Sequence, residues 1–275
     1  MALTDVKALK GQRLLILALD TTTAGGSLAL ACDGRLVDET TGDPGVTHGQ
    51  RQPGELTALL DRHGLATEAV DRYVVAAGPG SFTGLRVGMA TIQGLALAHD
   101  KRVIAISVLD TLVEIAARLA HRDALGPELI APWVDAKRGE VFSALYGPAS
   151  STRQADGRWA AGSRWPVALE PVAAPPAPLL DAWADMLAAH RVWLIGDGVA
   201  ESGSREELTD RLGPGSRAIQ ETPPLAGVMA VMASLEPWSE RAVAPHALRP
   251  IYVRRPDAEL ARDRRRAKAG VVTKP

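Results

Sequence analysis

The sequence has 275 residues and a formal net charge of −1 at pH 7, with 46% hydrophobic and 23% charged residues. This is the composition of an ordinary globular protein, and the length suits one large or two modest domains, since domains usually have about 100–200 residues. The balanced charge excludes a general attraction to the phosphate backbone of a nucleic acid, so any such contact has to be local or shared with a partner.

Cysteine and histidine usage indicate the compartment and the metal content. Cys32 is the only cysteine and has no partner for a disulfide, which favours a reducing compartment; its position predicts a buried strand residue. The six histidines are scattered, so the sequence predicts no metal site.

No apolar run reaches the roughly 20 residues of a membrane span, and residues 1–11 carry charges where a signal peptide would be apolar. We therefore expect a cytoplasmic protein with no membrane contact.

The first half of the chain predicts three antiparallel strands followed by alternating helices and strands. Asp33 and Gly34 are a tight-turn signal, so the second and third strands should pair as a hairpin. The predicted strands cover residues 14–19, 26–31, 36–40, 73–77 and 103–106, and the predicted helices cover residues 50–63 and 83–98. The order βββαβαβ is typical of a ribonuclease-H-like lobe, which is doubled in actin, sugar kinases and Hsp70 chaperones.

A weaker copy of this pattern follows in the second half. Residues 129–134 are predicted to form a strand that is followed by Asp135. A short turn then leads to Gly139, and residues 141–146 are predicted to form the next strand. The fold class is therefore predicted as α/β, with two ribonuclease-H-like lobes of the actin, Hsp70 and sugar-kinase type. In duplicated folds of this kind the first strands of the two lobes end near each other at a cleft, so we expect Asp20 and Asp135 to face one another there.

The predicted domains are an N-terminal lobe at residues 13–107 and a C-terminal lobe at residues 108–253. Residues 149–178 are rich in Pro, Ala, Ser and Gly, which predicts a surface loop. Further along, we expect helices at 181–190 and 225–235 and a strand at 192–195 that runs into Gly196, Asp197 and Gly198. We expect residues 254–275 to form a charged, flexible tail, for which direct contact with tRNA is an alternative to simple solvation.

The glycine-rich segment at residues 78–88 joins a buried strand to a helix. Backbone amides near Ser81 therefore lie at the positive end of the helix, where an anion such as a nucleotide phosphate can dock. The alternative, which the residues alone favour, is that the glycines allow tight turns and close packing while Ser81 or Thr83 caps the helix.

Small residues recur along that helix. Gly84 and Gly88 lie one turn apart and Gly94 follows; because Gly costs about 1 kcal/mol relative to Ala inside a helix, we expect something to pack there. The packing element is either a helix of this chain or another subunit, and a homodimer is also open. The predicted partner interface consists of Ser81, Phe82, Thr83, Gly84, Arg86, Gly88 and Thr91.

Five segments in the same order resemble the TsaB (YeaZ) family. They are residues 17–22, 78–86, 93–98, 135–142 and 196–198. The block Gly-Ser-Phe-Thr-Gly at residues 80–84 is the most specific of them, and the resemblance covers residues 13–255. The loop at 149–178 and the charged tail have no counterpart in these motifs.

The resemblance implies an actin-like fold and a role in forming N6-threonylcarbamoyladenosine (t6A) at position 37 of tRNAs that read codons beginning with A. In that family TsaB pairs with its paralogue TsaD, which holds the metal and transfers the threonylcarbamoyl group, and the ATPase TsaE joins the pair. We therefore expect a pseudoenzyme without catalytic residues of its own, which works in a heterodimer and contacts tRNA indirectly.

The sequence offers a test of this division of labour. TsaD carries a His-x-x-x-His metal motif after the strand that follows the glycine-rich helix, where this chain has Val108 and Leu112. Neither side chain has a lone pair to offer a metal. An interpretation as a glycoprotease, which would need the same histidines, fails for this reason.

The alternative function is that of an actin-like ATP-dependent phosphotransferase with Mg²⁺ held by Asp20 and Asp135. Against it, residues 21–26 are short for a phosphate-binding hairpin, and Asp20 equally fits a carboxylate that caps its own turn. Binding of ATP or ADP without turnover is left open, although the subunit role requires no cofactor. The residues predicted to bind a nucleotide are Asp20, Thr21, Asp135, Gly196, Asp197 and Gly198.

Overall fold

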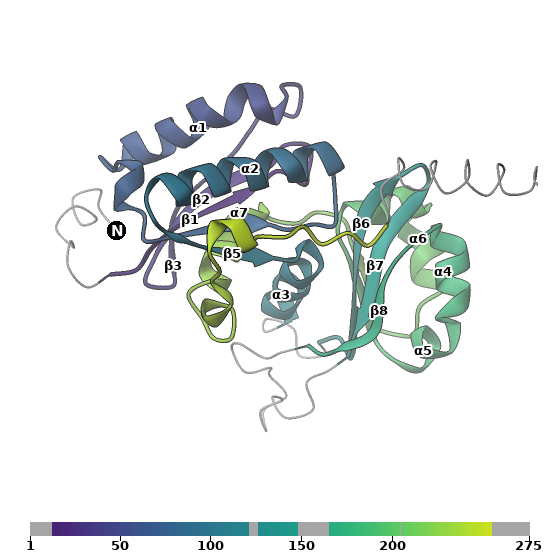
Figure 1. Cartoon of the computed structure of the whole chain (residues 1–275). Coiled ribbons are helices and arrows are strands. Elements are labelled where there is room, and N and C mark those ends of the chain that lie inside the picture. The colour runs from purple at the N-terminus through teal and green to yellow at the C-terminus, as the bar shows by residue number, and fades with distance from the viewer. Residues whose placement is uncertain (1–12, 121–125, 148–164, 204, 255–275) are drawn as a thin grey trace, which may run out of the picture.

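The computed structural model describes residues 13–120, 126–147, 165–203 and 205–254 (Figure 1). Within these ranges the chain forms two five-stranded sheets with helices packed against them. The predicted tail beyond Arg254 lies outside the described residues. None of the described helices combines the length and the apolar character needed to cross a membrane.

The first sheet has the order β3-β2-β1-β4-β5. Strands β1 to β3 are antiparallel, and β4 and β5 run parallel to β1. In sequence, α1 precedes β4, α2 connects β4 to β5, and α3 follows β5. This confirms the predicted βββαβαβ order. The elements are β1 (Leu15–Asp20), β2 (Ser27–Cys32), β3 (Arg35–Thr41), α1 (His48–Arg62), β4 (Arg72–Ala76), α2 (Phe82–Ala98), β5 (Arg102–Ile106) and α3 (Val108–Ala120).

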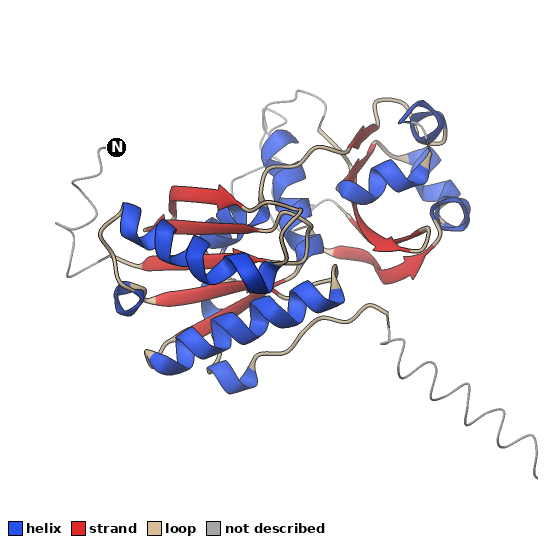
Figure 2. Cartoon of the chain, turned by 90° about the horizontal axis from the view of Figure 1, so that it is seen from above, coloured by secondary structure: helices blue, strands red, loops and turns tan. Residues whose placement is uncertain are grey.

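Helices cover both faces of the first sheet, so β1 is buried along its whole length. Successive side chains of a strand point to opposite faces. Leu17 and Leu19 accordingly join the core under α1 and α2, whereas Ile16 and Ala18 join the core formed with α3 and α7 (Leu225–Met232). Figures 1 and 2 show α1 and α2 side by side over the same face.

The second sheet has the order β10-β9-β6-β7-β8 and repeats the beginning of the first, because β6, β7 and β8 are antiparallel and β9 is parallel to β6. Two ribonuclease-H-like lobes are thus confirmed. Its elements are β6 (Leu129–Lys137), β7 (Glu140–Tyr146), β8 (Val167–Ala174), α4 (Pro176–Ala182), α5 (Ala184–Ala189), β9 (Val192–Ile195), α6 (Arg205–Asp210) and β10 (Arg217–Ile219).

Helix α7 belongs by contact to the first sheet, although the sequence assigns residues 225–232 to the C-terminal lobe. It packs on β1, β2 and β3 and on α3. Its first-turn amides are capped from that sheet: Ala226 donates to the Ser27 hydroxyl at 3.0 Å and Gly227 donates to the Glu39 carboxylate at 2.6 Å. The chain therefore returns to the first sheet, and one core joins both lobes.

Three predictions need correction. Residues 149–164 of the predicted loop lie outside the described residues, and the remainder to residue 178 contains β8 and the start of α4. Strand β8 was missed because Pro171 lies within it, which an edge strand tolerates. The single helix predicted at 181–190 is two short helices, α4 and α5, that meet at Trp183. Cys32 is half-buried rather than buried, because it ends β2 beside the hairpin turn.

Candidate functional site

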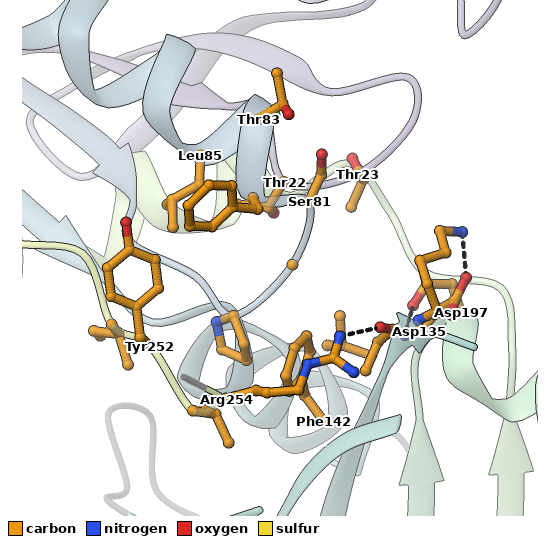
Figure 3. Close-up of a pocket in the computed structure, with 18 of the residues that line it drawn as sticks. Thr22, Thr23, Ser81, Thr83, Leu85, Asp135, Phe142, Asp197, Tyr252 and Arg254 are labelled. Atoms are coloured by element: carbon orange, nitrogen blue, oxygen red, sulfur yellow. Dashed lines mark hydrogen bonds and ion pairs between the residues drawn. The ribbon is translucent and has the colours of Figure 1, made fainter. Parts of the chain in front are cut away.

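A cavity of about 650 Å³ opens between the two lobes, within the size range of small-molecule sites (Figure 3). It is lined mainly by the turn after β1, the glycine-rich loop before α2, the end of β6 with its turn, and residues 251–254. Single residues of α1, β7 and the loop after β9 complete the lining. Figure 3 shows Ser81 and Thr23 on one side of the cavity and Arg254 and Phe142 on the opposite side.

Asp20 does not line this cavity. It is only 1% exposed, and both of its oxygens accept bonds from its own turn: Oδ1 from the Thr22 amide at 2.8 Å and from the Thr22 hydroxyl at 2.5 Å, and Oδ2 from the Thr23 hydroxyl at 2.8 Å. This is the turn-capping role. Thr22 and Thr23, which are not among the predicted nucleotide-binding residues, line the cavity instead.

Thr21 is buried and ties this turn to α2. Its hydroxyl donates to the carbonyl of Gly84 at 2.7 Å. A Cβ atom at Gly84 would lie 1.9 Å from the Thr21 carbonyl oxygen, and one at Gly88 would lie 2.2 Å from the Thr21 hydroxyl. The two glycines therefore allow close packing within the chain, and both are buried, so they present no exposed surface of their own to a partner.

The other predicted interface residues differ in accessibility. Ser81, Phe82, Thr83 and Arg86 are exposed. Ser81 is the N-cap of α2, since its hydroxyl accepts from the Gly84 amide at 3.2 Å, which supports the capping interpretation of the glycine-rich segment. Thr91 is half-buried, and its hydroxyl donates to the carbonyl of Val87 at 2.9 Å.

The end of β6 and the loop after β9 each bring one carboxylate to the cavity, Asp135 and Asp197. The Asp135 amide donates to Asp197 Oδ1 at 3.0 Å, and Asp135 itself accepts from the Lys137 amide at 2.6 Å and forms an ion pair with the Lys137 ammonium. The pKa of Asp197 is raised, first by its partial withdrawal from water and also by the charge of Asp135, while Lys137 opposes this shift. Lys137 and Arg138 both have positive φ, at 62° and 63°, which ordinary residues adopt rarely.

Gly196 and Gly198 position Asp197 rather than touch the cavity. A Cβ atom at Gly196 would lie 2.2 Å from the carbonyl oxygen of Trp133, and one at Gly198 would lie 3.0 Å from it. The two glycines let the loop sit directly on β6. Of the three predicted residues in this loop, Asp197 is the one that lines the cavity.

These contacts test the predicted magnesium site. The structure does not bring Asp20 and Asp135 together at the cavity, because Asp20 is committed to its turn, and Asp135 is already neutralised by Lys137. The residues therefore do not fit an ion held between these two carboxylates. Over the described residues, no cluster of three His, Cys, Asp or Glu side chains suits a metal ion either.

The C-terminal residues 251–254 form a wall that the sequence did not predict. The Ile251 amide donates to Ala77 in the first lobe at 2.8 Å, and Arg254 donates to Glu140 and to the carbonyl of Ala136 in the second lobe, both at 2.6 Å. Arg254 is thus anchored and is not part of a free tail. No local pattern distinguishes it from the arginines that follow, so its pairing could not be read from the sequence.

An exposed aromatic pair stands at the mouth of the cavity. The rings of Phe82 and Tyr252 are 5.7 Å apart at their centroids, each residue is 41% exposed, and the Arg86 guanidinium lies 4.0 Å from the centroid of Phe82. Such rings can stack on a nucleobase or pack against a partner protein.

A family model described as TsaD, tRNA N6-adenosine threonylcarbamoyltransferase, matches residues 46–158. The tRNA threonylcarbamoyladenosine biosynthesis protein TsaB of Bacillus subtilis is 35% identical over 133 residues, and that of Haemophilus influenzae is 36% identical over 133 residues. The chain is similar to the TsaB (YeaZ) proteins.

The match to the two TsaB sequences covers 48% of this chain and 55% and 53% of theirs, so the chain spans about half the length of the curated TsaB relatives it matches. The structure of YeaZ from Pseudomonas aeruginosa extends the likeness, with a TM-score of 0.64 and 27% identity over 87% of this chain and 99% of YeaZ. These findings confirm the family resemblance, and the YeaZ likeness covers both lobes.

Proposed function

We propose that this chain is a non-catalytic subunit of the complex that forms t6A at position 37 of tRNAs reading codons beginning with A. Its partner is a TsaD-type transferase, a TsaE-type ATPase joins the pair, and tRNA is contacted through the complex. The observation that carries the non-catalytic role is that Val108 and Leu112, at the place of the TsaD metal ligands, are 1% and 3% exposed and lie in the core shared by the lobes. The names of the TsaB relatives support the pathway.

We infer that the partner packs on the outer face of α1 and α2. With Gly84 and Gly88 turned inward, the outer face of α2 presents Ala90, Gly94 and Leu97. Leu97 is 73% exposed, and a Cβ atom at Gly94 would meet nothing within 4 Å. A protruding leucine beside small residues suits the close approach of another helix. A second copy of this chain is the alternative occupant of this face.

Nucleotide binding without turnover is a separate proposal, supported by the size of the cavity between the lobes and by the helix start at its edge. With Asp20, Thr21, Gly196 and Gly198 in structural roles, the predicted residues that line the cavity are Asp135 and Asp197. ATP or ADP would have to be held largely by backbone amides and by the rings of Phe82 and Tyr252. The subunit role requires no cofactor in this chain.

The test is threonylcarbamoyl transfer to tRNA by a TsaD-type enzyme with and without this chain, beside this chain alone with ATP and a divalent metal. Activity that needs both proteins supports the subunit role. Turnover by this chain alone would overturn it. Full activity of the transferase without this chain would equally contradict it.

A further inference from the structure

A second cavity, of about 360 Å³, lies between α3, the end of β7 and the segment that follows α7. It shares no lining residue with the cavity between the lobes. Its walls are aromatic and apolar: Tyr146, Trp165 and Trp238 line it together with Met232 and Leu235. Trp165 is 7% exposed, whereas Leu235 at the rim is 46% exposed, so the cavity reaches from the core to the surface.

Carboxylates converge on the same cavity. Asp110, Glu114 and Glu236 line it against one basic side chain, Arg241. The Asp110 Oδ1 atom accepts from the Tyr146 hydroxyl at 2.9 Å, and Glu114 forms an ion pair with Arg118 at 2.7 Å. Burial raises the pKa of Asp110, although the Tyr146 bond and the charge of Arg241 oppose this. A positive charge beside Asp110 would therefore offset the free-energy cost of burying its ionised carboxylate.

The aromatic walls already hold one cation. The guanidinium of Arg241 lies 4.2 Å from the centroid of Trp238, which is the geometry of a cation–π contact. An anion such as a phosphate would be repelled by three carboxylates in this cavity. The charge of the cavity is therefore the opposite of that expected for a nucleotide site.

We propose that this second cavity binds a small organic cation, namely a protonated amine carried on an aromatic or aliphatic body. The carboxylates of Asp110 and Glu236 would pair with the ammonium group, and the walls formed by Trp165 and Met232 would cover the body. The volume lies at the lower end of the range for ligand sites, which suits a ligand of this size. This site is independent of the proposed subunit role.

The first experiment is calorimetric titration of the full chain with phenethylammonium, phenethyl alcohol and phenylacetate, which have similar bodies and differ in charge. We expect the ammonium to bind about tenfold more tightly than the alcohol, because it gains ion pairs in a partly buried site, and the anion to bind least. Equal affinity for the three probes, or no binding of the ammonium, would overturn the proposal.

Matched variants identify the site. Glu236 and Glu240 are exposed glutamates on the same segment, and only Glu236 lines the cavity. We expect Glu236→Gln to weaken ammonium binding about threefold and Glu240→Gln to leave it unchanged, since a rim charge contributes modestly. Asp110→Asn should weaken binding more; if this variant fails to fold, the comparison of the two glutamates still decides. Equal effects of the two glutamate variants would refute the site.

Discussion

Asp20, which the sequence offers as a magnesium ligand, has a structural role in its own turn. Its carboxylate accepts three bonds from the turn that follows β1, at 1% exposure. We expect Asp20→Ala to lower the free energy of unfolding by about 3 kcal/mol, because it leaves buried donors unpaired. Asp43→Ala, which removes an exposed bond to the Gly45 amide, should cost less than about 1 kcal/mol.

Chemical denaturation of the two variants measures this difference. A magnesium ligand at Asp20 predicts the opposite result, in which Asp20→Ala folds with unchanged stability and loses affinity for Mg²⁺ and ATP. Stability and Mg²⁺ affinity measured on the same preparation therefore separate the two roles.

Gly84 and Gly94 form a second matched pair on α2, one packed against the chain and the other open. A Cβ atom at Gly84 would meet the Thr21 carbonyl oxygen at 1.9 Å, whereas one at Gly94 would meet nothing within 4 Å. We expect Gly84→Ala to destabilise the chain by about 2–3 kcal/mol through overpacking, and Gly94→Ala to stabilise it by up to about 1 kcal/mol through helix propensity. Thermal unfolding of both variants measures this. Equal effects would show that α2 does not sit on the turn after β1.

Elements whose sequence pattern reports their burial could be predicted, and elements that depend on distant contacts could not. The buried apolar runs of β1 and β4 and the N-cap at Ser81 carry local signals, so the order of the first lobe follows from them. The edge strand β8 has no such signal, because half-buried residues alternate around Pro171. The inward direction of Gly84 depends on Thr21, which is 63 residues away, so helical spacing alone could not distinguish internal packing from a partner interface.

Helix α7 is held to the first sheet partly through a titratable cap. The Glu39 carboxylate accepts from the Gly227 amide at 2.6 Å, and burial raises the pKa of this carboxyl despite that bond. In the pH range between its ordinary pKa and its raised value, the folded chain binds more protons than the unfolded chain, so stability falls as the pH rises through this range. Glu39→Gln removes this titration and keeps an acceptor for the amide.

We therefore expect the free energy of unfolding of the parent chain, relative to Glu39→Gln, to fall as the pH rises above about 4.3, the ordinary glutamate value. Denaturation across pH 4 to pH 8 measures this. Glu55→Gln is the control, because Glu55 pairs with Arg51 within α1. A pH-independent difference between the parent chain and Glu39→Gln would contradict the raised pKa of this buried carboxyl.

The outer face of α1 and α2 is tested by changing its most exposed side chain. Leu97→Lys should leave the fold intact, since Leu97 is 73% exposed, and should weaken association with the TsaD-type partner by about 2 kcal/mol or more if the leucine is buried there. Leu119→Lys on α3, where the leucine is 38% exposed, is the matched control. Analytical ultracentrifugation of mixtures reports the pairing, and equal affinities of the two variants would move the interface elsewhere.

At the scale of the whole molecule, the lobes are joined by one core and by the segment at residues 251–254. Helices α3 and α7 lie in the core that both sheets share, and Arg254 then reaches back to the second lobe. Neither feature is local in sequence: Arg254 and Glu140 are 114 residues apart. The doubled lobe pattern could therefore be predicted from the sequence, whereas the place of residues 251–254 in the wall of the cavity could not.

The pair between Arg254 and Glu140 should contribute to stability because both side chains are about 70% covered and meet at 2.6 Å across the two lobes. A double-mutant cycle with Arg254→Ala and Glu140→Ala should give a coupling of about 1 kcal/mol, and Arg254→Ala alone should cost more, since it also releases the carbonyl of Ala136. The exposed pair of Arg13 and Asp33, at 3.3 Å, should show a coupling near zero. Equal coupling in the two cycles would mean that residues 251–254 do not hold the two lobes together. A ligand could then displace this segment from the wall of the cavity.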